Sequence, residues 1–304
     1  MSEHENSTRT AADPVASPLR LPATLRLGAV HLTVSNLDRS VGFYRDAIGL
    51  RLHRREKAVA AMGVGGEDLV VLHEEPVARR AGHHAGLYHY ALLHPSRVEL
   101  ARAALRLAAT RTPIQGASDH GTHEAIYLPD PDGNGIELAA DRPRERWPEP
   151  LDYAGGPHPL DLDGLLALVA GEEPRREAAP GLVVGHVHLH VGDLDRGLAF
   201  YRDVLGFDLM TFMPGAAAFV SAGGYHHHLG FNVWRGEGVP PAPADRVGLR
   251  HWTVVLDDPA DLDAVRRRVR ASGVEVEEYG GDGFVVRDPW DIAVLFTVDP
   301  RSPS

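Results

Sequence analysis

Apolar and polar residues alternate along two short stretches of the chain, near residues 30 and 187. The alternation is strictest in HVHLHV (186–191), which puts three aliphatic residues on one face of an extended segment and three histidines on the other. The histidines are His186, His188 and His190. Each stretch is followed by the apolar spacing of an amphipathic helix, which contains an aromatic pair and ends at Gly49 or Gly206. Both regions therefore predict a strand followed by a helix, with the apolar face of the strand packed on the helix.

These two regions form an internal repeat. GAVHLTVSNLDRSVGFYRDAIGL (28–50) and GHVHLHVGDLDRGLAFYRDVLGF (185–207) are identical at 13 of 23 positions, at an offset of 157 residues. Three short strand-like runs follow each helix. The chain is therefore predicted to consist of two related halves.

A weaker copy of the same unit follows within each half. GLYHYALL (86–93) aligns with GLRHWTVV (248–255), and DPDGNGIEL (130–138) aligns with DPWDIAVLF (288–296). One βαβββ unit has a sheet with one bare face, so such units should pair and curl their sheets into a cup. The four predicted modules span 25–76, 85–141, 182–236 and 247–299.

The repeat also suggests domain boundaries. The polar segment 1–24 is expected to be a disordered arm. Two modules would form a first domain over 25–141, and two more a second domain over 182–299. The linker between them, 142–181, contains a proline-rich stretch and one expected short helix.

Composition narrows the range of functions. With 31 Lys and Arg against 42 Asp and Glu, the net charge is −11, which argues against a nucleic-acid or membrane-surface binder. Cysteine is absent, which excludes disulfides, thiolate nucleophiles and cysteine-ligated metals. No stretch has the apolar length of a signal peptide or a membrane span, so we expect a cytoplasmic protein. By contrast, 18 histidines in 304 residues are an excess of the side chain that most often binds metals.

The motifs LDRxxxFYRDxLG and DPDGNxxEL resemble those of the vicinal oxygen chelate superfamily, which contains glyoxalases, bleomycin-resistance proteins and type I extradiol dioxygenases. The resemblance covers about 250 of the 304 residues and is greatest to the two-domain catechol 2,3-dioxygenases. It implies an α+β fold in which four βαβββ modules pair into two cup-shaped β-barrels.

The resemblance also implies where metal ligands would lie. The superfamily places them on the first strand of one module and on the first and last strands of another. In the first half these positions hold Ala29, His89 and Glu137. In the second half they hold His186, His251 and Leu295. Neither half has two histidines and a glutamate, but His186 combined with His89 and Glu137 does. We therefore predict a composite site between modules two and three, formed within one chain or by a subunit swap, and a metal-free cup from modules one and four.

Two further residues match extradiol positions in DHGTHEAIYLPDPDGNGIEL (119–138). Tyr127 lies ten residues before Glu137, the spacing of the family, and His120 lies seven before Tyr127. The resemblance implies that Tyr127 and His120 orient the oxygens of the substrate.

A third match lies in GGYHHHLGFN (223–232), which resembles the strand that carries the acid–base histidine of the family. On this alignment His227 exchanges protons with the substrate, a role that suits an imidazole. Strand alternation would place His226 and His228 on the opposite face.

Together these features predict an Fe(II)-dependent extradiol dioxygenase that opens catechol or a substituted catechol with O₂ to a 2-hydroxymuconate semialdehyde-type product. Mn(II) would also suit the ligand set. The expected partners are a small aromatic diol and O₂, without nucleic acid or membrane, and a homo-oligomer is expected.

Two alternatives stay open. A glyoxalase-like lyase or isomerase would use four protein ligands, two of them glutamates, and only one glutamate occupies a ligand position here. A non-enzymatic ligand-binding protein of the bleomycin-resistance type would need no such set of polar residues.

Overall fold

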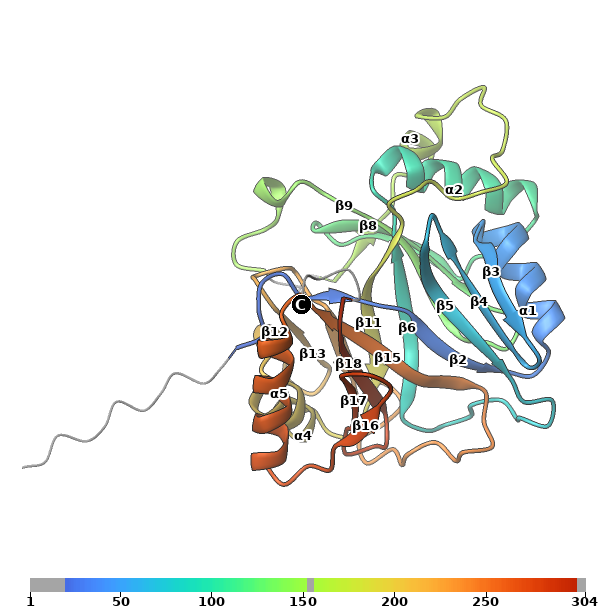
Figure 1. The fold of residues 1–304 in the computed structure, drawn as a ribbon. Helices are drawn as coiled ribbons and strands as arrows, with labels where there is room; N and C mark the ends of the chain where they lie inside the picture. The colour runs from blue at the N-terminus through green and yellow to red at the C-terminus, as the bar shows by residue number, and fades with distance from the viewer. Residues whose placement is uncertain (1–19, 152–155, 300–304) are drawn as a thin grey trace, which may run out of the picture.

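The computed structural model describes residues 20–151 and 156–299, which form two nine-stranded sheets with helices packed against them (Figure 1). Most of the expected disordered arm, 1–24, lies outside the described residues. In its described part, Leu21 is buried and its N–H donates to the carbonyl of Gly206 at 3.0 Å, so these residues pack on the protein. None of the described helices has the length and apolarity to span a membrane.

All four predicted modules are present as strand, helix and three strands. Module one contains β2 (Val30–Val34), α1 (Leu37–Phe43) with a π-helical end η1 (Tyr44–Ile48), β3 (Arg51–Glu56), β4 (Val59–Val64) and β5 (Glu67–Glu74). Module two contains β6 (Gly86–Leu93), α2 (Arg97–Ala109), β7 (Gly116–Asp119), β8 (His123–Pro129) and β9 (Gly135–Asp141).

The second half repeats this order. Module three contains β11 (Val183–His190), α4 (Leu194–Leu198), η3 (Ala199–Val204), β12 (Asp208–Met213), β13 (Ala217–Ser221) and β14 (Leu229–Asn232). Module four contains β15 (Gly248–Leu256), α5 (Pro259–Ala271), β16 (Glu277–Tyr279), β17 (Gly283–Arg287) and β18 (Ala293–Val298). Outside the modules lie β1 (Arg26–Leu27), η2 (Arg144–Arg146), β10 (His158–Pro159) and α3 (Leu162–Ala167).

The repeated helices begin and end where the sequence predicts. Asn36 and Asp193 cap their first turns, each side chain accepting a hydrogen bond from the backbone N–H three residues later. Gly49 and Gly206 then turn the chain with φ of 86° and 91°, a left-handed conformation that favours glycine.

Modules from different halves join through their sheets. The first sheet has the order β10-β7-β8-β9-β6-β11-β14-β13-β12 and combines modules two and three. The second has the order β16-β17-β18-β15-β2-β5-β4-β3, with β1 on β15, and combines modules four and one. The expectation of closed barrels is wrong, because among the described strands the edges β10 and β12, and likewise β16 and β3, do not pair. Two modules meet through one strand each, β6 with β11 or β15 with β2, so their outer strands stay apart.

Modules of the same half are joined differently, through their helices. Arg106 on α2 is buried and donates to the carbonyls of Ala47 at 3.0 Å and Ile48 at 2.6 Å, at the end of η1. Arg268 on α5 likewise donates to the carbonyls of Val204 and Leu205 at the end of η3. Because the sheets connect the two halves, the domain boundaries at 25–141 and 182–299 stay a prediction.

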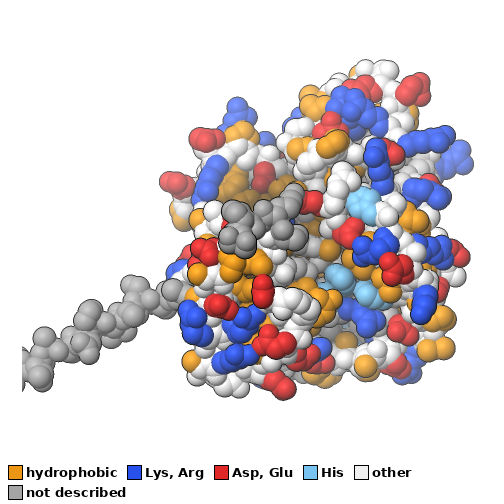
Figure 2. All heavy atoms as spheres, viewed as in Figure 1, with side chains coloured by type: hydrophobic (Ala, Val, Ile, Leu, Met, Phe, Trp, Pro, Cys, Tyr) orange, Lys and Arg blue, Asp and Glu red, His pale blue; other side chains and the backbone are white. Residues whose placement is uncertain are grey.

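The surface carries charged side chains of both signs. Figure 2 shows basic and acidic side chains interspersed over one face, with histidine exposed only in small patches. Both faces of β11 are buried: Val187 and Leu189 are inaccessible on one, and His186, His188 and His190 are nearly so on the other. The excess of histidine is therefore largely inside the molecule.

Candidate metal centre

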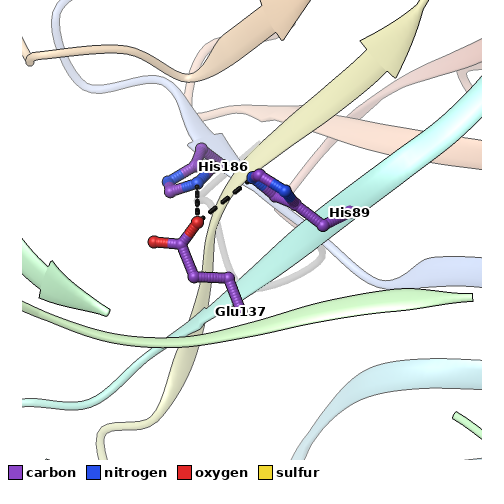
Figure 3. A group of neighbouring side chains, drawn as sticks. All are labelled: His89, Glu137 and His186. Carbon is purple, nitrogen blue, oxygen red and sulfur yellow. Dashed lines mark hydrogen bonds and ion pairs between the residues drawn. The ribbon is translucent and has the colours of Figure 1, made fainter. Parts of the chain in front are cut away.

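Three side chains meet on one face of the first sheet, where β9, β6 and β11 lie side by side (Figure 3). Glu137 Oε2 is 3.1 Å from His89 Nε2 and 3.2 Å from His186 Nε2. The register explains the meeting, because Ala91 on β6 pairs with Glu137 on one side and His186 on the other. Its small side chain leaves room for the three larger ones, and His89 lies two residues earlier on the same face.

The protonation states of this group suit a divalent cation. Burial raises the pKa of Glu137, but the charges and hydrogen bonds of His186, His123 and His89 outweigh it, so the pKa lies well below its ordinary value. Burial lowers the pKa of His186, in part opposed by the charge of Glu137. At neutral pH the group therefore offers an anionic carboxylate and a neutral imidazole lone pair, the forms that bind metals.

Sequence reasoning missed one close neighbour of this group, His123. Its Nε2 lies 3.1 Å from Glu137 Oε1, and its side chain is buried. A signal was present, since alternation along β8 places His123, Ala125 and Tyr127 on one face.

Tyr127 and His120 both lie beside the predicted ligands. Tyr127 pairs with Glu137 across β8 and β9, and its ring is 5.5 Å from that of His89. His120 Nε2 and the Tyr127 hydroxyl are 2.7 Å apart. Burial and the charge of His123 lower the pKa of His120 to about 4, so its ring is neutral at pH 7. The roles of both residues stay predictions.

The three consecutive histidines do not follow strand alternation. They lie in a turn before β14, which begins only at Leu229, so the expectation that His226 faces away from His227 is wrong. The His227 ring is 4.2 Å from that of His186, and the His226 ring stacks at 4.8 Å on His123. The Nδ1 atoms of His226 and His227 are 2.8 Å apart. His228 instead contacts the hydroxyl of Ser221 at 2.9 Å.

An aromatic wall borders the centre on the side of β14. The rings of Tyr88 and Trp234 pack edge to face at 5.3 Å, and both lie against His188, at 5.1 and 5.4 Å. Tyr88 is 39% exposed and Trp234 54%, so the wall reaches from the buried histidines to solvent. Tyr88 also contacts His89, with ring centroids 4.8 Å apart.

The second sheet differs at the corresponding positions. Its counterparts of His89, Glu137 and His186 are His251, Leu295 and Ala29. His251 stacks on His31 at 3.9 Å, beside a cavity of about 750 Å³. Leu295 is buried where a carboxylate would be needed.

Comparisons with known proteins agree with this architecture. The model of the Glyoxalase/Bleomycin resistance protein/Dioxygenase superfamily matches residues 26–138 and 183–296. Over 269 residues the chain is 42% identical to a catechol-2,3-dioxygenase from Bacillus subtilis (strain 168), an alignment that covers 86% of this chain and 93% of that protein.

Two solved structures resemble the fold. One from Bacillus subtilis subsp. subtilis str. 168 has a TM-score of 0.61 and 15% identity, with coverage of 90% of this chain and 86% of that one. Glyoxalase I from Zea mays has a TM-score of 0.55 and 18% identity, with coverage of 90% and 92%. At these identities the two structures support the fold and not an activity.

Proposed function

Because the chain belongs to the glyoxalase/bleomycin resistance protein/dioxygenase superfamily, we propose that it is an Fe(II)-dependent extradiol dioxygenase. Its substrate would be catechol or a substituted catechol, opened to a 2-hydroxymuconate semialdehyde-type product. The observation that carries this proposal is the meeting of His89, Glu137 and His186, from two modules of different halves. The 42% identity to a catechol-2,3-dioxygenase supports the same reaction class.

The donor set fits the proposed metal. Two imidazole nitrogens and one carboxylate oxygen are the facial triad typical of non-haem Fe(II) oxygenases, and Mn(II) would also suit it. His89, Glu137 and His186 would hold the ion, which when bound supplies open positions for the two vicinal oxygens of the substrate and for O₂. A glyoxalase-type centre would need a second glutamate, whereas here the neighbour of Glu137 Oε1 is His123.

His227 would exchange a proton with the bound diol. Burial lowers the pKa of its ring well below the ordinary value, and the neighbouring charge of His186 adds to this. The ring is therefore neutral at pH 7, the form that can accept a hydrogen bond from a substrate hydroxyl. Its contact with His186 keeps it beside the proposed metal position.

Tyr127 and His120 would orient the substrate on the opposite side. The hydrogen bond between the Tyr127 hydroxyl and His120 Nε2 fixes the direction of the phenolic oxygen. The Tyr127 ring lies 5.5 Å from that of the proposed ligand His89, and Tyr127 pairs with Glu137 across neighbouring strands. The exposed wall of Tyr88 and Trp234 would bind the hydrocarbon face of an aromatic ring and exclude water from it.

Oxygen uptake tests this proposal directly. Protein reconstituted anaerobically with Fe(II) should consume O₂ and form a yellow product when catechol and air are added. His227→Gln should keep its iron and lose about 10²- to 10⁴-fold in kcat, since it removes one acid–base group. His158→Gln, at an exposed position of β10 in the same sheet, is the matched control and should retain full activity. An absence of O₂ uptake with catechol and with several substituted catechols would refute the proposed activity.

A further inference from the structure

A second group of metal-type donors lies next to Glu137. It consists of His123 from β8, Asp141 at the end of β9, and His226 from the turn before β14. One donor atom of each lies within 4.8 Å of a donor atom of the other two. His226 Nε2 and Asp141 Oδ1 are 3.1 Å apart. His123 and Asp141 are partners across β8 and β9, and the pairing of modules two and three brings His226 to them.

Each of the three side chains also has a second polar atom that contacts a neighbouring side chain. His123 Nδ1 is 2.8 Å from Thr122 Oγ1, Asp141 Oδ2 accepts from the Tyr225 hydroxyl at 3.0 Å, and His226 Nδ1 is 2.8 Å from His227 Nδ1. Metal-binding histidines commonly use one nitrogen for the metal and the other for such a contact, which fixes the orientation of the ring. Here the contacts of both Nδ1 atoms direct the Nε2 atoms of His123 and His226 toward carboxylates.

The group is enclosed on most sides. The side chains of His226 and His123 are 0% and 3% exposed, and that of Asp141 is 26% exposed, which leaves an approach from solvent. The ring of Trp147 packs edge-on against His226 at 5.1 Å. A carboxylate and two imidazoles grouped in such a place are donor types that bind a divalent cation.

Glu137 connects this group to the first one. Its Oε2 contacts His89 and His186, while its Oε1 contacts His123 Nε2 at 3.1 Å. The two oxygens of one buried carboxylate thus face two different sets of donors. This is the arrangement by which a carboxylate bridges two neighbouring cations in dinuclear sites.

We propose that His123, Asp141 and His226 form a second site for a divalent first-row transition-metal ion, adjacent to the first and bridged to it by Glu137. This site goes beyond the proposed dioxygenase function, which needs only one metal. Nitrogen and carboxylate donors in this number suit Zn²⁺ as well as Fe(II) or Mn(II), so Zn²⁺ is a practical probe.

Metal stoichiometry tests the proposal without any assay of activity. The full-length protein, stripped with a chelator, is loaded with Zn²⁺, desalted and measured by elemental analysis. The wild type should retain two ions per chain. Asp141→Asn and His89→Ala should each retain one ion, and the variant that combines both substitutions should retain none. His73→Ala, which removes a histidine from the second sheet, is the matched control and should retain two.

The outcomes separate this site from the first one. A single ion in the wild type that persists in Asp141→Asn and is lost in His89→Ala would overturn the second site and leave the first intact. A single ion with the opposite pattern would support the second site and refute the first. No bound ion would overturn both. If circular dichroism shows that Asp141→Asn folds poorly, His226→Gln replaces it in the test. This variant should also retain one ion.

Discussion

The sheet of modules two and three and the sheet of modules four and one have the same strand order, but they differ in the side chains on corresponding strands. In the first sheet Glu137 and His186 lie on either side of the small residue Ala91 and meet His89. In the second sheet only His251 stands at a corresponding position, and Leu295 replaces the glutamate. The scaffold and its chemistry are therefore separable, since the same fold carries ligand-type residues in one sheet and an aliphatic residue in the other.

What the two halves share is a structural anchor. The Tyr44 hydroxyl donates to Asp130 Oδ2 at 3.2 Å, and the Tyr201 hydroxyl donates to Asp288 Oδ2 at 2.8 Å. Both aspartates also accept backbone N–H groups of the turn before the last strand. The tyrosines lie in the repeated FYRD motif, so the strongest motif of the sequence joins two modules of one half and takes no part in the metal centre.

The second sheet has histidines of its own, which contact one another. His31 Nδ1 is 3.1 Å from His73 Nε2, and His31 stacks on His251. Burial, followed by the charges of neighbouring histidines, lowers the pKa of His31 to about 2 and that of His251 to about 4. These rings are neutral at pH 7, and they contact one another rather than an acidic group at the position of Leu295.

The largest expected difference between the two sheets is the effect of removing the histidine at corresponding positions. His89→Ala should lose the Fe(II) of the first site and reduce O₂ uptake with catechol by at least about 10³-fold, because the proposed reaction needs that metal. His251→Ala should retain iron and activity within about twofold. Iron content and initial rates of O₂ consumption measure both effects. If His251→Ala loses its iron and His89→Ala keeps it, the assignment of the site to the first sheet is wrong.

Removing the shared anchor should affect both halves in the same direction. Tyr44→Phe and Tyr201→Phe should each lower the free energy of unfolding by about 2 kcal/mol, because each removes a hydrogen bond from a tyrosine hydroxyl to a buried aspartate. Tyr44→Phe should cost at least as much, since Tyr44 also accepts from the Tyr90 hydroxyl at 2.9 Å. Urea denaturation measures the loss, and metal content should not change. A loss of less than about 0.5 kcal/mol in either variant would contradict the structural role.

The smallest expected effect concerns His94, a buried histidine beside the first sheet that has no histidine counterpart beside the second. His94 follows β6, and its counterpart is the buried Leu256, the last residue of β15. Neither ring nitrogen of His94 has a hydrogen-bond partner among the described residues. Burial, with a smaller contribution from the charge of Arg106, lowers its pKa to about 3.

His94→Leu should therefore change the pH dependence of stability. The folded pKa of about 3 is below the ordinary value of 6.5, so the stabilisation is full above about pH 6.5 and is lost progressively as the pH falls toward 3. Between pH 7 and 5.5 the wild type should lose about 1 kcal/mol more than His94→Leu, which has no such group. Paired urea titrations at the two pH values cancel the shared contribution of the other histidines. Equal losses in the two proteins would show that His94 is protonated in the folded state.

Much of the fold could be predicted from the sequence. Period-2 alternation and the 157-residue repeat indicate the strands, the helices and the four modules, because these patterns reflect local burial. The resemblance placed candidate ligands on β6, β9 and β11, and comparison of the halves suggested that modules two and three combine. Open sheets in place of barrels could not be predicted, since closure depends on how far the outer strands curl.

The sequence by itself determined the modules, the anchor motifs and the separation of His186, His89 and Glu137 over two halves. Only the tertiary structure decided that His123 contacts Glu137 and that His226 turns toward Asp141. Alternation correctly describes a side chain inside a regular strand such as β11. It fails in the turn before β14, where the direction of His226 depends on packing against residues about 85 to 100 positions away. Contacts of this kind depend on the register between modules, which no local pattern encodes.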